Sequence, residues 1–200
     1  MKFNHDNISP LDSRYANKIS EFRENFSESA LIQIRFDIEI EWLLYICINL
    51  PKTFKPLSKQ SIKKITKIKD SFDNKSVLRI KKIESTTNHD VKAVEYYIRD
   101  QFLKDKVLST YTHLIHFGLT SEDINSLSYA HMIKNGISIY IKELDKVNKI
   151  LKNYSKKWAK QPFLARTHGQ AASPSTLGKE FKVFHERINR EIQHLKSIKP

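Results

Sequence analysis

Apolar residues in the second half of the chain recur in steps of three and four, the spacing of one face of an α-helix. Within residues 120–158 this stripe consists of Ala130, Ile133, Ile137, Tyr140, Leu144, Val147, Leu151, Tyr154 and Trp158. A helix over these residues would be on the order of 55 Å long. A second stripe follows Ser173 and Pro174, which suit the cap and the first position of a helix. It consists of Leu177, Phe181, Phe184, Ile188, Ile192 and Leu195.

These two stripes predict long helices packed lengthwise, as in a helical bundle. Two helices alone leave apolar sides uncovered, because a bundle core needs helices around it. We therefore expect other chains or further segments to complete the bundle. The sequence ends in Ser-Ile-Lys-Pro directly after the second predicted helix. This ending favours the N-terminal portion of a longer protein.

Residues 27–50 carry two conflicting patterns. Apolar and polar residues alternate strictly, which taken alone is typical of a half-buried strand. The length of the segment, Ser27 as a candidate N-cap and Pro51 as a stop favour a helix instead. Arg35 and Glu39 also stand at the i,i+4 spacing of a helical ion pair. We predict a helix. The alternating apolar residues are Ile32, Ile34, Phe36, Ile38, Ile40 and Trp42.

Two more segments have helical spacing. Residues 58–72 predict a short basic helix, and a stripe from Val91 to Phe102 predicts another. Only 4 Gly and 6 Pro occur in 200 residues, which favours long helices over a turn-dense β fold. The predicted fold class is all-α.

Composition narrows the classes of function. The chain has 35 Lys and Arg against 22 Asp and Glu, a net charge of +13, which suits nucleic acid, an anionic membrane surface or an anionic small substrate. Lysines lie on nearly every predicted helix, which favours solvated faces over a specific nucleic-acid site. A single cysteine, Cys47, excludes an intramolecular disulfide. No apolar run approaches the roughly 20 residues of a membrane helix, and residues 1–6 lack the apolar core of a signal peptide. We predict a cytoplasmic protein with no membrane partner.

Four polar clusters stand out, at residues 9–15, 84–90, 120–123 and 165–180. In the first, Arg14 can grip a phosphate or carboxylate through two hydrogen bonds, and Tyr15 can donate another or pack against a base. A surface arginine beside a packed tyrosine is the alternative. In the third cluster, Thr120 or Ser121 can cap a helix, with Asp123 closing a capping box.

The second cluster, at residues 84–90, precedes the helical stripe that begins at Val91. Asn88 is a plausible cap of that helix, and Asp90 suits its positive end. Capping does not explain His89. A helix N-terminus with free N–H groups, hydroxyls and a histidine is a good receptor for phosphate or carboxylate.

His168 is the centre of the fourth cluster, in a Gly-containing turn between the two long predicted helices. Such a histidine can act as a general acid or base, bind a metal, or simply pack. The other histidines lack paired metal-ligand spacings with nearby carboxylates, so we predict no metal site. No Gly-rich phosphate loop, nucleophile elbow or kinase signature occurs. The residues therefore indicate general acid–base catalysis on a bound anion.

Taken together, the clusters resemble a known family, the adenylosuccinate lyases of the fumarase/aspartase superfamily, in particular the bacterial type. The matching segments stand in the family's order and spacing over almost all 200 residues. They are Ser-Pro-Leu-Asp-Ser-Arg-Tyr (9–15), Thr-Thr-Asn-His-Asp-Val-Lys-Ala-Val-Glu-Tyr (86–96), His-Phe-Gly-Leu-Thr-Ser-Glu-Asp-Ile-Asn (116–125), and Arg-Thr-His-Gly-Gln (166–170) followed by Ser-Pro-Ser-Thr-Leu-Gly-Lys-Glu. The resemblance implies a helical N-terminal domain over residues 1–110, followed by the first long helices of a superfamily-type bundle over 111–200.

The resemblance also implies a function. Members eliminate fumarate from adenylosuccinate to give AMP, and from the succinylated carboxamide intermediate of purine synthesis. They use no metal or organic cofactor, and they are homotetramers whose active sites draw on three subunits. An anionic nucleotide, rather than nucleic acid, is the implied partner. Carried over by position, the site residues are His168 as the general acid, Arg14 and Tyr15 for the nucleotide, Asn88, His89 and Asp90 for the substrate pocket, and Thr120 and Ser121 for the succinyl carboxylate.

The sequence departs from the family pattern in three places. Ser13 and Ala171 stand where Gly and Pro are more usual. The family's mobile loop, Gly-Ser-Ser-x-Met-Pro-x-Lys-x-Asn, which carries the serine thought to be the base, lies beyond Pro200. We therefore expect the 200 residues to be inactive by themselves. The alternatives are a sister lyase of the superfamily, such as argininosuccinate lyase, and a basic, non-catalytic helical nucleic-acid-binding protein.

Overall fold

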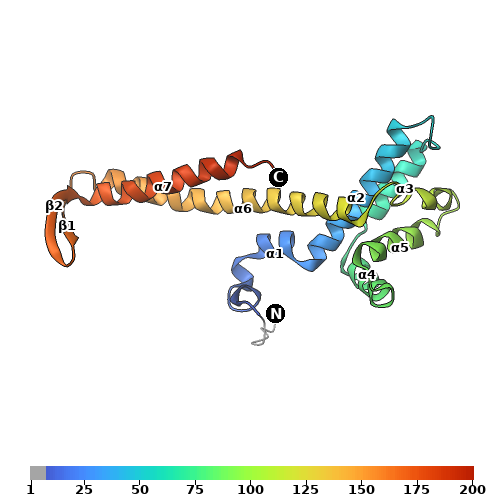
Figure 1. The fold of residues 1–200 in the computed structure, drawn as a ribbon, viewed down its shortest axis with the longest axis horizontal. Helices are drawn as coiled ribbons and strands as arrows, with labels where there is room; N and C mark the ends of the chain where they lie inside the picture. The colour runs from blue at the N-terminus through green and yellow to red at the C-terminus, as the bar shows by residue number, and fades with distance from the viewer. Residues whose placement is uncertain (1–7) are drawn as a thin grey trace. The chain divides into compact units, whose positions relative to one another are not determined.

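The computed structural model of the chain describes residues 8–200 (Figure 1). This part of the chain is mainly α-helical, which confirms the predicted fold class. Residues 1–6, on which the argument about a signal peptide rests, lie outside the described residues. The elements are the α-helices α1 (Ser20–Phe26), α2 (Glu28–Asn49), α3 (Lys59–Asp70), α4 (Asn74–Thr87), α5 (Asp90–Phe102), α6 (Ser121–Lys157) and α7 (Leu177–Ser197), the 3₁₀ helices η1 (Pro10–Asp12), η2 (Ala16–Lys18) and η3 (Leu108–Leu114), and the strands β1 (Pro162–Thr167) and β2 (Gln170–Thr176).

The chain divides into two compact units, one up to Met132 and one from Ile133 to Pro200. The first contains α1 to α5, the 3₁₀ helices and the start of α6, and the second contains the rest of α6, the strands and α7. The predicted domain boundary near residue 110 stays a prediction. Within residues 8–200, no helix is both long and apolar enough to cross a lipid bilayer.

Helix α2 resolves the conflict over residues 27–50 in favour of a helix. The Ser27 hydroxyl accepts a hydrogen bond from the Ala30 N–H at 3.2 Å, and the helix ends at Asn49, with Leu50 as its C-cap directly before Pro51. Apolar residues can stand at every second position of this helix because α2 is covered on more than one side. Its fully buried residues follow helical spacing, and several of the apolar residues between them are half-buried.

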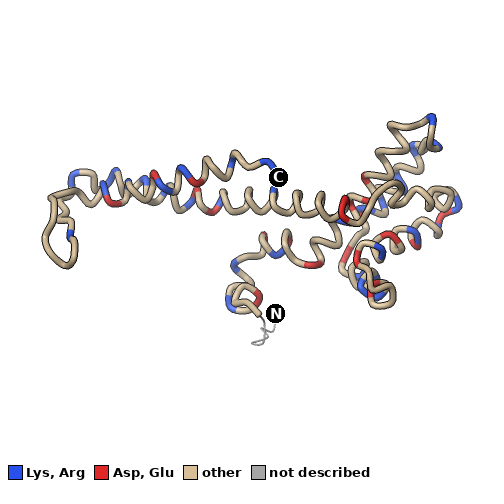
Figure 2. Tube along the Cα trace, in the orientation of Figure 1, with Lys and Arg blue, Asp and Glu red and all other residues tan. Residues whose placement is uncertain are grey.

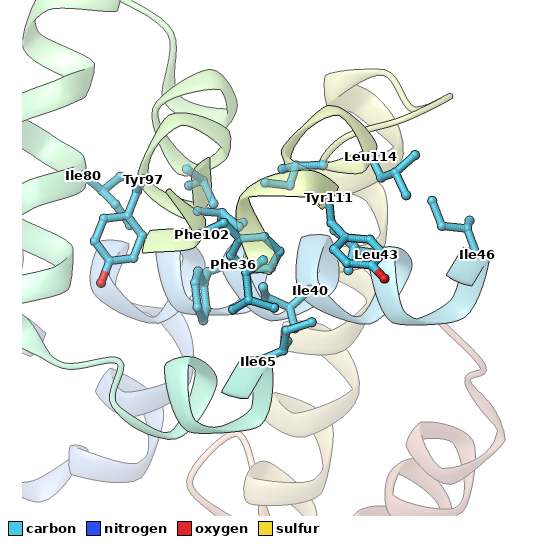
Figure 3. Packing of buried hydrophobic residues seen from close by; sticks show 14 of the residues in the cluster. Phe36, Ile40, Leu43, Ile46, Ile65, Ile80, Tyr97, Phe102, Tyr111 and Leu114 are labelled. Atoms are coloured by element: carbon cyan, nitrogen blue, oxygen red, sulfur yellow. The ribbon is translucent and has the colours of Figure 1, made fainter. Parts of the chain in front are cut away.

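The core of the first unit forms where α3, α4, α5 and η3 pack around α2 (Figure 3). Phe36 is fully buried, with its ring centroid 4.7 Å from that of Phe72 and 5.9 Å from that of Tyr97. Cys47 is buried in the same cluster, as a small apolar residue. The core includes residues of α4 and α5, the two helices that meet at the cluster of residues 84–90.

The second unit contains the part of the fold that the sequence pattern did not predict. Ser173 and Pro174 were expected to begin a helix, but they lie in β2, where Pro174 pairs with Leu164 of β1. The helix begins three residues later, and the Thr176 hydroxyl accepts a hydrogen bond from the Lys179 N–H. The predicted helix start is therefore wrong, because antiparallel pairing between strands gives residues 170–176 their partners.

The two long helices lie where the spacing predicted them, and α6 is one continuous helix of 37 residues. Within the second unit, α6 and α7 share a buried polar contact in which Asn148 Oδ1 and His185 Nδ1 lie 2.7 Å apart. Much of the predicted apolar seam is exposed in this chain, including Val147 at 49% and Phe184 at 54%. If the expected bundle forms, other chains or further segments have to cover these side chains.

Basic side chains do not gather on one element of the described chain. Lys and Arg are distributed along α3, α4, α5, α6 and α7, and Asp and Glu lie between them on the same helices (Figure 2). Several pair locally, as Lys69 does with Glu41 and Arg79 with Asp100. Such a distribution is typical of solvated helix faces.

Gly178 allows the start of α7 to approach the end of α6. Its N–H donates to the Trp158 carbonyl at 2.9 Å, and an added Cβ would lie 2.5 Å from the Ser155 carbonyl oxygen and 2.6 Å from Ala159 Cα. Both neighbours are backbone atoms, so the helices would have to move apart. We expect Gly178→Ala to destabilise the protein by about 1–3 kcal/mol, the usual cost of overpacking.

The measurement is urea unfolding followed by circular dichroism, with Lys179→Ala as the control at an exposed neighbouring position. If Gly178→Ala unfolded at the same urea concentration as Lys179→Ala, the close approach of the two backbones would be wrong.

Candidate active site

The first unit is organised around two charged residues that α2 buries. Arg35 is 5% exposed and Glu39 is 1% exposed, one helical turn apart. The i,i+4 spacing suggested that they pair with each other. In the structure, each pairs instead with a residue far along the chain. The predicted local ion pair is therefore wrong, and the two side chains connect α2 to the polar clusters.

Arg35 joins two of these clusters. Its Nη2 lies 2.7 Å from Asp90 Oδ2, at the start of α5, and its Nε donates to Asn125 Oδ1 at 3.0 Å, in the second turn of α6. Burial works to raise the pKa of Asp90, but the Val91 N–H and the Arg35 guanidinium outweigh it and hold that pKa below its usual value. Asp90 is therefore held as a carboxylate.

Glu39 reaches a third segment. Its Oε1 lies 2.6 Å from His116 Nδ1, in the loop between η3 and α6. Burial raises the pKa of Glu39, and the contact with His116 acts against that rise. Trp42, three residues further along α2, donates from Nε1 to the Phe117 carbonyl at 2.8 Å. One face of α2 thus holds both the ring and the backbone around His116.

A pocket of about 520 Å³ opens where these segments meet. His89 contributes from the turn before α5, His116 from the loop, and Ser121 from the first position of α6. The lining offers imidazole, hydroxyl and ammonium groups, the donors that an anionic ligand requires. The complete lining is Thr87, His89, Val91, Lys92, Glu95, Tyr96, His116 and Ser121.

The cluster at residues 84–90 contains two helix ends rather than one. Asn88, the expected N-cap, instead ends α4 in the left-handed conformation with φ of 50°. His89 is the N-cap of α5, and its Nδ1 accepts a hydrogen bond from the Lys92 N–H at 3.2 Å. The assignment of the cap to Asn88 is therefore wrong. With Nδ1 engaged by the backbone, Nε2 is the ring nitrogen that His89 can offer to a ligand.

The cluster at residues 120–123 forms the half of the expected capping box that Asp123 contributes. Asp123 Oδ2 accepts from the Thr120 N–H at 2.7 Å and from the Thr120 hydroxyl at 2.9 Å, and α6 begins at Ser121. These bonds hold the pKa of Asp123 below its usual value. Ser121 faces the pocket, whereas the Thr120 hydroxyl is engaged by Asp123.

Arg14 and Tyr15 lie in the N-terminal segment and do not line this pocket. Both are exposed, and the Arg14 guanidinium stacks over the Tyr15 ring at 5.5 Å. Of the candidates in the first unit, the structure thus brings His89 and Ser121 into one pocket, fixes Asp90 and Thr120 beside them, and leaves Arg14 and Tyr15 apart.

His168 belongs to the second unit, at the tip of the hairpin. It and Gly169 form the two-residue loop between Thr167 and Gln170, with φ of 49° and 77°. Positive φ at both central residues is the requirement of a type I′ turn. His168 is exposed, so its imidazole is open to a ligand. The expected Gly-containing turn is confirmed, but it joins two strands rather than two helices.

Three residues, two of them in these clusters and one in the loop before α6, share an unusual backbone conformation. Among residues 8–200, the non-glycine residues with positive φ are Asn88, His116 and His168. Such positions concentrate at functional sites, where surrounding structure holds them in place. The same sites also contain groups that the sequence reasoning missed, namely Arg35, Glu39 and the pocket residue His116. For Arg35 and Glu39, the available signal was their place in the middle of a helix rich in apolar residues.

The chain is similar to known proteins along almost all of its length. The model of a family described as lyase matches residues 13–200. The chain therefore belongs to this lyase family. Among curated relatives, it is 40% identical over 194 residues to an adenylosuccinate lyase of Buchnera aphidicola (from Schizaphis graminum), covering 96% of this chain and 42% of the relative. It is 38% identical over 196 residues to the adenylosuccinate lyase of Escherichia coli, with the same coverage. The chain thus spans less than half the length of these relatives.

Solved structures agree on the fold. The fumarate lyase from Mesorhizobium sp. BNC1 superposes with a TM-score of 0.72 at 18% identity, over 88% of this chain and 39% of that protein. The β-carboxy-cis,cis-muconate cycloisomerase from Acinetobacter calcoaceticus gives 0.68 at 17% identity, over 90% and 40%. At such low identity the likeness concerns the helical architecture alone.

The capping contact of Asp123 predicts a pH dependence of stability. Its pKa is lowered in the folded protein, so it stabilises the fold above the unfolded pKa of about 3.9, and this contribution is lost as pH falls through the folded value. We expect Asp123→Asn to be less stable than wild type at neutral pH. We also expect the gap between the two proteins to close as the pH falls below about 4.

Thermal unfolding at a series of pH values measures this gap, with the adjacent exposed carboxylate changed in Glu122→Gln as the control. A gap that stayed constant down to the lowest pH would rule out the bond to Thr120 as its source.

Proposed function

We propose that the protein containing this chain is an adenylosuccinate lyase, which eliminates fumarate from adenylosuccinate and from the succinylated carboxamide intermediate of purine synthesis. The observation that carries the proposal is the identity of about 40% along 96% of the chain to enzymes of that name. Sister lyases of the superfamily remain the alternative, and the solved structures, at 17–19% identity, do not favour one of them.

The chemistry of such an elimination suits the groups of the first unit. A base removes a proton beside a carboxylate, an acid protonates the departing nitrogen, and donors hold the negative charge of the intermediate. His89 and Ser121 supply donors in the pocket, with Lys92 beside them, and His116 adds a ring nitrogen. The carboxylate of Asp90 is neutralised by Arg35, which limits its repulsion of an anionic substrate.

In this proposal His168 is the general acid, and its exposed position at a rigid two-residue turn supports that role. Thr120 and Ser121 bind the succinyl carboxylate, and Arg14 and Tyr15 hold the nucleotide. The last two lie outside the pocket, which suits a site completed by residues of other copies in a homotetramer. We further propose the cytoplasm as the compartment, no metal or organic cofactor, and the family's division into a domain over 1–110 and a bundle over 111–200.

A substitution of His168 tests the assigned acid. In the protein as its gene encodes it, we expect His168→Gln to lower kcat on adenylosuccinate by about 10²–10⁴-fold, the usual contribution of general acid–base catalysis. Binding of the substrate should persist, because the phosphate and succinyl contacts are made elsewhere. Steady-state kinetics and equilibrium binding measure the two effects.

His194→Gln, at an exposed position in the last turn of α7, is the matched control and should retain the wild-type rate. A wild-type rate in His168→Gln would exclude His168 as the acid. Cleavage of argininosuccinate in preference to adenylosuccinate by the unaltered protein would replace the proposed function with that of the sister enzyme.

A further inference from the structure

The first unit contains a buried carboxylate, Glu39, that has a single hydrogen-bonded neighbour, His116. The side chain of Glu39 is fully buried among the apolar residues of α2. Its Oε1 contacts His116, while its Oε2 has no hydrogen-bond partner among the described residues. A buried carboxylate with one polar partner is unfavourable compared with an apolar residue of similar size. Its contribution must therefore lie in what it does to His116.

His116 is held from three directions. Glu39 fixes the ring through Nδ1, and the Trp42 bond to the Phe117 carbonyl fixes the backbone that follows. Ile115, on the other side, is buried in the core. These contacts maintain a backbone φ of 62°, which a non-glycine residue rarely adopts without support.

The contact with Glu39 leaves one nitrogen of His116 for the pocket. While Glu39 is ionised, its oxygens only accept hydrogen bonds, so the contact requires a protonated Nδ1 that donates a hydrogen bond to Oε1. Nε2 is then the ring nitrogen left for the pocket, which His116 lines together with His89, Lys92 and Ser121. A carboxylate behind a histidine in this way fixes both the tautomer and the orientation of the ring.

We propose that Glu39 is a positioning residue, which keeps the Nδ1 proton of His116 directed toward α2 and turns Nε2, with its lone pair, toward the pocket, where it can accept a hydrogen bond or a proton from a ligand. Glu39 itself does not touch the ligand. The proposal rests on the proposed function only for its kinetic test, because the state of the His116 ring can be measured without a substrate.

The test compares Glu39→Gln with Glu41→Gln in the protein as its gene encodes it. Glu41 is two residues further along α2, its side chain is 62% exposed, and it pairs with Lys69, so it controls for the loss of a carboxylate from the same helix. The ring nitrogens of His116 are observed by NMR in protein labelled with ¹⁵N-histidine and assigned with His116→Gln. Activity on adenylosuccinate is measured in parallel.

In wild type and Glu41→Gln we expect the His116 signals of a ring protonated at Nδ1. In Glu39→Gln we expect the signals to shift toward a mixture of tautomers, because a carboxamide can donate as well as accept. We expect kcat/KM to fall by about tenfold or more, as for other groups that orient a histidine from behind. Glu39→Asp keeps the charge on a shorter side chain, so we expect its His116 signals and its kcat/KM to lie between those of wild type and Glu39→Gln. It serves as the test variant if Glu39→Gln does not fold.

Unchanged His116 signals in Glu39→Gln, or in Glu39→Asp if that variant has to be used, would overturn the proposal, even if activity fell. An unaltered protein without activity on adenylosuccinate would refute the proposed function instead, and the His116 signals would still decide the role of Glu39.

Discussion

The guanidinium of Arg35 is the group on which the arrangement of the first unit depends. A buried cation must be compensated, and the compensation comes from Asp90 at the start of α5 and Asn125 near the start of α6. Because the guanidinium is planar and its donors have fixed directions, it sets the orientation of both helix starts relative to α2. Apolar packing around Phe36 brings the helices together, and this polar contact determines how their polar ends face each other.

The parts of the fold that the sequence could predict are those with local causes. Ser27 caps the helix that it was expected to cap, and the Asp123 side chain makes its half of the expected capping box, because both bonds join residues three apart. Arg35 and Glu39 were expected to pair with each other because residues four apart are neighbours on a helix surface. Their real partners are Asp90 and His116, and no local pattern specifies a partner across the core.

The missed features of the candidate site have the same origin. The cluster at residues 84–90 was expected to form a single helix cap. In the structure Asn88 caps the end of α4 and His89 caps the start of α5, and this depends on the left-handed backbone conformation of Asn88. Ser173 and Pro174 fit a helix start as well as any pair in the chain. Their place in a strand depends on β1, whose apolar residues gave no strand signal of their own.

Asn88, His116 and His168 have a left-handed backbone conformation that glycine adopts at lower cost, but glycine has no side chain to offer to a ligand. An L-residue in this conformation costs about 1–2 kcal/mol relative to glycine, which is only partly offset by the greater freedom of glycine in the unfolded chain. Glycine in place of Asn88 or His168 would therefore relieve this cost while removing an amide or an imidazole, whereas at His116 it would also leave the buried Glu39 without its partner. Selecting variants of this protein for thermal resistance alone would thus favour losing the His168 side chain, which we propose as the general acid.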